Sequence, residues 1–174
     1  MNKPRRFVVT GTSGTGKTSI INELRSMGMI CFDEPGRKVL TSGSELAKTE
    51  PEQFIAEMLS QSVTDYQAAS SGQTVFYDRG LPDIVAYAHR FKVPPSISQQ
   101  AADAHRYDST IFLAPPWEEI FVNDEVRRAT FDEYLDFHQL ILNTYQELDY
   151  SILVLPKLPV HERIEFIQSA ISGA

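Results

Sequence analysis

This sequence lacks a pair of cysteines and any apolar run of membrane length, and no secretion signal is expected in it. Cys31 is the single cysteine in 174 residues, so an intramolecular disulfide is excluded, and its apolar neighbours predict a small core residue. The longest apolar runs have the length of β-strands, whereas a membrane span needs about 20 residues. The apolar run after the N-terminal basic cluster is too short for a signal peptide. We therefore expect a cytoplasmic protein with no membrane contact.

Positive charge is also in short supply. The chain has 16 lysines and arginines against 23 aspartates and glutamates, a formal net charge of -7. This balance is unsuited to coating nucleic acid, so no nucleic-acid partner is expected. The four histidines lack the spacing of metal ligands, and no zinc site is expected. The apolar content of 42% and the charged content of 22% are typical of a compact protein, and residues 1–174 are predicted to form one domain.

Short β-branched or aromatic runs alternate along the chain with longer stretches of helical periodicity. Helices are predicted over 52–69 and 130–148 and near the C-terminus, and the expected strands are 7–10, 29–32, 74–77, 110–113 and 152–155. This alternation predicts an α/β fold, a three-layer α/β/α sandwich around a five-stranded, mostly parallel sheet. The acidic, polar stretch 115–129 is expected to be a short lid insertion.

The expected helix 130–148 has the clearest helical pattern. Its apolar residues recur at steps of three and four, which a strand of period two cannot produce. The residues expected on its apolar face are Phe131, Tyr134, Leu135, His138, Ile141, Leu142, Tyr145 and Leu148.

The first expected strand leads directly into a phosphate-binding motif. Residues 11–18 satisfy G-x-x-x-x-G-K-[ST], and an apolar helical pattern follows. Such a loop turns its backbone N–H groups inward, the lysine reaches the β and γ phosphates, and the threonine hydroxyl binds Mg²⁺. The alternative is a glycine-rich turn with a solvated lysine. The expected nucleotide contacts are Gly11, Thr12, Ser13, Gly14, Thr15, Gly16, Lys17, Thr18 and Ser19, with Thr18 also a metal ligand.

The residues after the third expected strand favour one class of phosphate-loop protein. Asp78 ends that strand, where a carboxylate partner of Mg²⁺ is expected, although it could simply begin the next helix. Motor and remodelling ATPases usually place a water-orienting glutamate next, whereas this chain has Arg79, and a cation suits phosphoryl transfer. The Asn-Lys-x-Asp segment by which GTPases recognise guanine is missing after the later strands. ATP and a kinase reaction are therefore favoured.

The order of these motifs resembles the nucleoside and nucleotide kinase branch of phosphate-loop proteins. Glu34-Pro35 after the second strand and Asp78-Arg79-Gly80 carry this likeness with the loop. Within the branch, the chain is most similar to the small AAA domain ATP-binding family, which is similar to the ribosylnicotinamide kinase domain of the bacterial NAD-synthesis regulator. The resemblance implies ATP binding more strongly than any one substrate. It continues through Asp83, Ala86-Tyr87, Arg106-Tyr107-Asp108, Pro115-Pro116-Trp117, Asn123-Asp124, Arg127 and Glu162-Arg163.

The resemblance also implies roles for single residues. Glu34 corresponds to the carboxylate beside the acceptor hydroxyl, a candidate base, and Arg79 to the arginine near the transferred phosphoryl group. The alternatives are a surface carboxylate before a turn and an arginine in a salt bridge. Arg37 follows the Glu-Pro turn and Asp83 follows Asp78 by about one helical turn, so both are candidates to line an acceptor pocket.

The lid supplies the last candidates. Arg127 and Arg128 lie in the expected lid, where an arginine closing over the phosphates would exclude water, or they are solvated helix residues. The hypothesis is a kinase that uses ATP and Mg²⁺ to phosphorylate a small acceptor with a hydroxyl group, such as a nucleoside, nucleotide or related metabolite. The alternative is a nucleotide-dependent switch or slow ATPase that acts through a protein partner. The expected catalytic residues are Lys17, Glu34, Asp78, Arg79 and Arg127.

Overall fold

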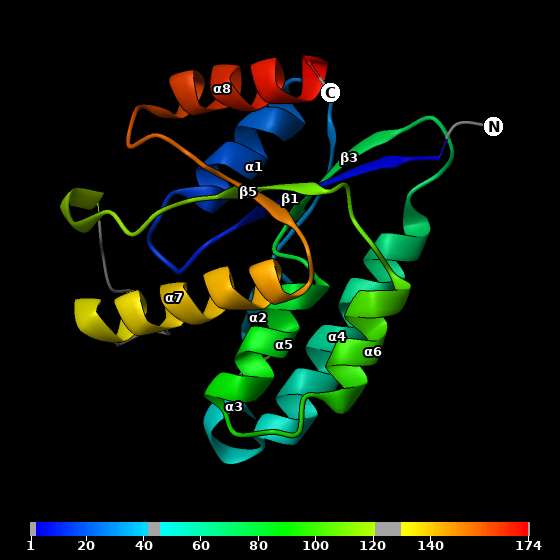
Figure 1. Cartoon of the computed structure of the whole chain (residues 1–174), viewed down its shortest axis with the longest axis vertical. Coiled ribbons are helices and arrows are strands. Elements are labelled where there is room, and N and C mark those ends of the chain that lie inside the picture. Colours follow the sequence, from blue (N-terminus) through cyan, green and yellow to red (C-terminus); the bar gives the residue numbers. More distant parts are fainter. Residues whose placement is uncertain (1–2, 42–45, 121–129, 174) are drawn as a thin grey trace.

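The computed structural model describes residues 3–41, 46–120 and 130–173. Strands and helices alternate along the chain, as the sequence predicts (Figure 1). The strands are β1 (Arg5–Thr10), β2 (Ile30–Phe32), β3 (Thr74–Asp78), β4 (Thr110–Leu113) and β5 (Ser151–Val154). The helices are α1 (Lys17–Ser26), α2 (Pro35–Thr41), α3 (Leu46–Thr49), α4 (Pro51–Ala68), α5 (Leu81–Arg90), α6 (Ser96–Ala104), the 3₁₀ helix η1 (Glu118–Ile120), α7 (Phe131–Glu147) and α8 (Val160–Ser172).

The five strands form one sheet in the order β2-β3-β1-β4-β5, and every neighbouring pair is parallel. The predicted fold class is thus confirmed. β1 lies at the centre of the sheet. The strands β2 and β3 lie on one side of it, and the strands β4 and β5, which come later in the chain, lie on the other. Ligands of open α/β sheets bind at such a switch point, outside the carboxyl ends of the strands.

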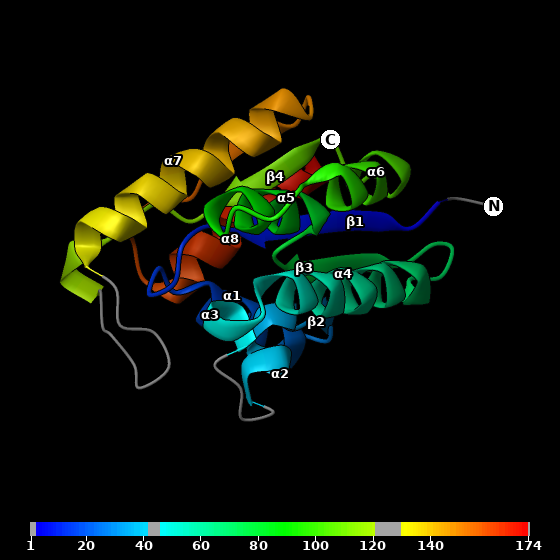
Figure 2. The same ribbon diagram turned by 90° about the horizontal axis from the view of Figure 1, so that it is seen from below.

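Helices cover both faces of the sheet. One face packs against α1 and α8, and its buried cluster includes Phe7, Ile20 and Ile164. The other packs against α4, α5 and α7 around Val8, Ile84 and Ile141. Figures 1 and 2 show α1 and α8 together on one side of the strands and α4 to α7 on the other. No helix within the described part of the chain is both long and apolar enough to cross a lipid bilayer.

Helix α7 begins and ends close to its predicted bounds but turns a slightly different face to the core. Thr130 caps it, because its hydroxyl accepts a hydrogen bond from the Glu133 N–H while the Glu133 carboxylate accepts one from the Thr130 N–H. Leu135, expected in the core, is 42% exposed, whereas Phe137 is buried. The Phe137 ring lies 4.7 Å from that of Tyr87 on α5, so packing between the two helices decides which side faces inward.

Candidate functional site

The phosphate loop joins β1 to α1 at the carboxyl edge of the sheet. Gly11, Gly14 and Gly16 have φ values of 132°, 73° and 81°, a region that other residues adopt only with strain. A side chain at Gly11 would also collide with the carbonyl oxygen of Ala114. The glycines of the motif are therefore required by the backbone path that curls the loop.

A carbonyl inside the loop holds the lysine. The Lys17 ammonium donates a hydrogen bond of 2.6 Å to the Thr12 carbonyl, which also accepts one of 2.9 Å from the Thr15 hydroxyl. Lys17 is 5% exposed, so its charge lies inside the structure and not in bulk solvent. Phosphate oxygens of a nucleotide would compete with the Thr12 carbonyl for the same ammonium group.

Asp78 and Thr18 form a second feature of this edge. β1 and β3 pair so that Asp78 lies beside Val9, and the Thr18 hydroxyl is 3.4 Å from Asp78 Oδ2. Burial raises the pKa of Asp78 to about 6, although Lys17 acts in the opposite direction. Its Oδ1 is buried and has no hydrogen-bond partner among the described residues. A carboxylate oxygen and a hydroxyl are ligands that Mg²⁺ prefers, so these residues fit a magnesium ion.

Arg79 connects two carboxylates in a buried cluster. Its Nε donates to Glu34 Oε1 at 2.9 Å and its Nη1 to Asp83 Oδ1 at 3.0 Å. Its backbone φ of 73° is unusual for a residue other than glycine, and such backbone strain is concentrated at functional sites. Burial opposes the charged form, but Tyr87, Glu34 and the nearby aspartates more than offset it and keep the pKa of Arg79 above its ordinary value.

Strand register explains why Glu34 and Arg79 meet. β2 and β3 are parallel, with Phe32 beside Tyr77, and continuing this register by two residues places Glu34 beside Arg79. Arg37, half exposed at the start of α2, extends the cluster because its Nε lies 3.5 Å from Glu34 Oε2.

Asp83 is the anchor of the cluster. In addition to the hydrogen bond from Arg79, its carboxylate accepts hydrogen bonds of 2.6 Å from the Thr10 and Tyr145 hydroxyls and one of 2.9 Å from the Gly80 N–H. An acceptor molecule would have to displace one of these groups to contact Asp83, whose side chain is almost completely buried.

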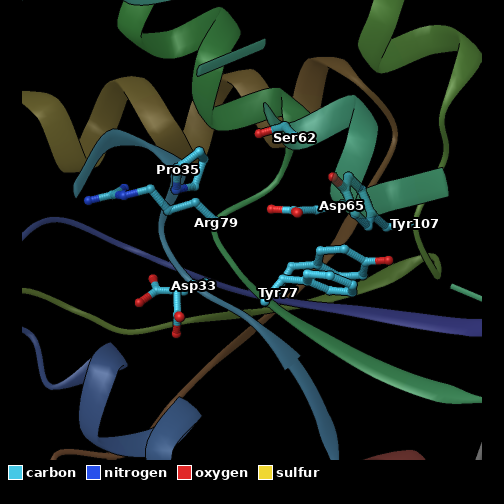
Figure 3. A pocket seen from close by; sticks show the side chains of 9 residues that line it. Asp33, Pro35, Ser62, Asp65, Tyr77, Arg79 and Tyr107 are labelled. Atoms are coloured by element: carbon cyan, nitrogen blue, oxygen red, sulfur yellow. The ribbon is translucent and has the colours of Figure 1, made fainter. Parts of the chain in front are cut away.

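A pocket opens beside this cluster, between β2, β3 and α4 (Figure 3). Phe32 and Tyr77 stack with ring centroids 5.2 Å apart. Burial raises the pKa of Tyr77 to about 12, and its hydroxyl is buried with no partner among the described residues. Asp65 points from α4 into the space between Tyr77 and Arg79. The lining residues are Phe32, Asp33, Pro35, Ser62, Asp65, Tyr77, Asp78, Arg79 and Tyr107.

The structure brings most of the candidate residues into two adjoining groups. The loop residues, Thr18 and Asp78 form one, and Glu34, Arg37, Arg79 and Asp83 form the other. Ser19 lies on the exposed side of α1. Arg127 and Arg128, with residues 121–129 of the expected lid, lie outside the described residues.

Ser62 and Asp65 at this edge were not predicted from the sequence, and Arg163 was named only as part of the family resemblance, with no role at the site. Ser62 and Asp65 continue the buried stripe of α4 after Ile55 and Met58, so polar residues at core spacing were the available signal. Arg163 gives the same signal on α8: it lies three residues after Val160 and four before Ile167, yet it is buried. A polar residue on an apolar stripe predicts a specific buried partner.

Known proteins resemble this chain in sequence family and in fold. The model of a family described as AAA domain matches residues 6–163. The chain belongs to this AAA domain family. No curated protein matches it.

Solved structures share the fold of this AAA domain protein at low sequence identity. The NadR protein in complex with NR has a TM-score of 0.76 and 18% identity over 97% of this chain and 50% of that one. This chain thus spans half of the NadR chain. Deoxyadenosine kinase from M. mycoides has a TM-score of 0.68 and 16% identity over 97% of this chain and 100% of its own. Shikimate kinase from Acinetobacter baumannii has a TM-score of 0.68 and 12% identity over 97% of this chain and 93% of its own. The AAA domain protein therefore has a phosphate-loop kinase fold.

Proposed function

We propose that this AAA domain protein is a kinase that transfers the γ-phosphoryl group of ATP, with Mg²⁺, to a hydroxyl group of a small acceptor such as a nucleoside, a nucleotide or a related metabolite. The observation that carries the proposal is the adjacency of two groups at one sheet edge. The phosphate loop follows β1, and the Glu34–Arg79–Asp83 cluster with its pocket lies at the ends of the neighbouring strands. A similar fold, that of NadR, is known in complex with NAD and AMP-PNP.

On the donor side, the backbone N–H groups of Gly14 and Gly16 and the Lys17 ammonium would bind the phosphates of ATP. Thr18 and Asp78 would hold Mg²⁺, which when bound neutralises charge on the phosphate oxygens. Lys17 would leave the Thr12 carbonyl and follow the β and γ phosphates, where it stabilises charge in the transition state. Arg127 and Arg128 would close over the phosphates from the lid.

On the acceptor side, the hydroxyl oxygen would bond to the γ-phosphorus as the bond from that phosphorus to the β–γ bridging oxygen breaks. Glu34 would orient this hydroxyl and take its proton, and the products are ADP and the phosphorylated acceptor. Arg79 Nη2 is buried and has no partner among the described residues, so it is a donor for the transferred group. Asp83 would fix Arg79, and Arg37 at the half-exposed rim would contact the acceptor.

The test is a panel of hydroxyl-bearing metabolites incubated with ATP, Mg²⁺ and the purified protein, with ADP release and acceptor mass followed together. We expect one acceptor class to gain the mass of one phosphoryl group and to accelerate ADP formation. Basal hydrolysis with every acceptor, together with nucleotide-dependent capture of a defined protein, would instead support a switch.

Lys17→Met gives the matched control for that panel. Since the ammonium is the principal cation of the loop, transfer should fall by at least about a thousandfold while the melting temperature stays close to that of the wild type. Lys157→Met removes an exposed lysine from the segment before α8 and should leave the rate unchanged. Full turnover by Lys17→Met would contradict the proposal.

A further inference from the structure

Arg163, on the first turn of α8, is a buried arginine behind the phosphate loop. It is 2% exposed, and its Nη1 donates a hydrogen bond of 3.0 Å to the Thr15 carbonyl. Its Nε and Nη2 are buried, and neither has a hydrogen-bond partner among the described residues. Burial lowers the pKa of Arg163.

A buried guanidinium with so few partners lowers the stability of the ligand-free protein. A buried guanidinium normally faces a carboxylate that offsets the loss of hydration, as Arg79 does. No ion pair of Arg163 occurs within residues 3–41, 46–120 and 130–173, and the side chain lies near the N-terminus of α8, where the helix dipole is itself positive. An anion bound at the neighbouring phosphate loop would stabilise this charge.

The bond to Thr15 also orients the loop. The C=O and N–H of one trans peptide point in opposite directions, so a Thr15 carbonyl directed at Arg163 turns the Gly16 N–H away from it. A Cβ built at Gly16 would lie 2.8 Å from Arg163 Nη1, so the guanidinium lies immediately against the loop. In a phosphate loop, the N–H groups on the inner side bind the phosphates.

We propose that Arg163 is a positioning residue of the phosphate loop, which fixes the Thr15–Gly16 peptide through its bond to the Thr15 carbonyl and whose charge is compensated by the phosphates of the bound nucleotide. The inference rests on the proposed function, because it assigns the ligand of the loop as a nucleoside polyphosphate. It adds a second buried cation, 146 positions after Lys17 in the sequence, to the binding of that ligand.

Arg163→Met tests the proposal by calorimetric titration with ATP and Mg²⁺. The dissociation constant should rise about tenfold to a hundredfold, since bonds made by charged groups contribute most to affinity. The loss should be smaller for AMP than for ATP because the phosphates, and not the base, compensate the charge. The melting temperature of the nucleotide-free variant should equal or exceed that of the wild type, since an uncompensated buried charge is removed.

Two variants make the result decisive. Arg163→Gln keeps an N–H donor for the Thr15 carbonyl but removes the charge, and it should show the same larger loss for ATP than for AMP. It decides the question by the same criterion if Arg163→Met does not fold. Lys157→Met removes an exposed charge near α8 and should leave the dissociation constant within about twofold.

A lowered melting temperature with unchanged ATP affinity in the Arg163 variants would overturn the inference, because Arg163 would then be purely structural. Equal losses for ATP and AMP would overturn it as well. These outcomes differ from failure of the proposed function, in which the wild type itself would bind no ATP or binding would not depend on Lys17.

Discussion

Two buried arginines at one edge of the sheet differ in how their charge is balanced. Arg79 lies between Glu34 and Asp83, with N–O distances of 2.9 and 3.0 Å. Among the described residues, the Arg163 side chain has one hydrogen-bond partner, the neutral carbonyl of Thr15. The proposed acceptor side is thus held in place before any ligand arrives, whereas the phosphate loop lies beside a positive charge that a polyphosphate would balance.

This difference in charge balance suits the two arginines to different tasks at the sheet edge. A cation fixed by two carboxylates keeps its geometry and needs little reorganisation during a reaction. A cation that no carboxylate compensates is stabilised most when an anion binds nearby, and this raises the affinity for that anion.

Arg79→Met should cost the nucleotide-free protein about 3–5 kcal/mol of unfolding free energy, because it removes the buried cation that Glu34 and Asp83 share. Urea denaturation at neutral pH measures this loss. The matched variant is Arg163→Met, which should show no comparable loss. Equal destabilisation by the two variants would remove the contrast between the arginines.

Asp78 should make the stability of the metal-free protein decrease as pH rises. Its pKa is about 6 in the folded protein against an ordinary value of 3.8, so the folded state binds the proton more tightly. Unfolding free energy should therefore decline between about pH 4 and 6, by about 3 kcal/mol in total from this group, and then level off. The measurement compares urea midpoints of the wild type and Asp78→Asn across this range.

Asp78→Asn should lack that contribution and be the more stable protein above pH 6 without metal. Mg²⁺ binding by the wild type should have the opposite trend and strengthen as pH rises through 6, since the metal needs the ionised carboxylate. Identical pH profiles for the two proteins would show that Asp78 does not titrate there.

Tyr77→Phe should have the smallest effect on stability, a change within about 1 kcal/mol, because the buried hydroxyl has no well-aligned hydrogen-bond partner among the described residues and interacts with the nearby Arg6 guanidinium. If the acceptor binds in the pocket, its KM should rise while kcat changes little. Thermal denaturation and steady-state kinetics with the identified acceptor measure the two effects. A large loss of stability would mean that the hydroxyl is satisfied in solution.

The sequence predicted the strand and the helix on either side of the phosphate loop because these residues are contiguous. Gly11 to Thr18 form an unbroken motif between a strand and a helix, and the structure has β1 and α1 in those places. Asp78 at the end of β3 followed from strand patterning alone. Local periodicity also predicted the strands and main helices within a few residues.

Contacts between distant segments are harder to predict. The bond between Glu34 and Arg79 depends on the register of β2 and β3, which local patterns do not specify. Arg163 lies 148 residues from Thr15, and its burial was visible in the sequence only as a charged residue on an apolar stripe. On α7, Phe137 is buried and Leu135 is exposed because the Phe137 ring packs against Tyr87 on another helix.

Gly11 has a consequence for the spacing between the phosphate loop and the end of β4. Because it has no side chain, the first residue of the phosphate loop lies directly against the carbonyl of Ala114, where β4 ends and the segment 115–129 starts. A side chain at this position would meet the Ala114 carbonyl oxygen, which belongs to the backbone and cannot turn away as a flexible side chain can. An added methyl group at position 11 would therefore act as a wedge between the phosphate loop and the end of β4, from which the expected lid segment begins.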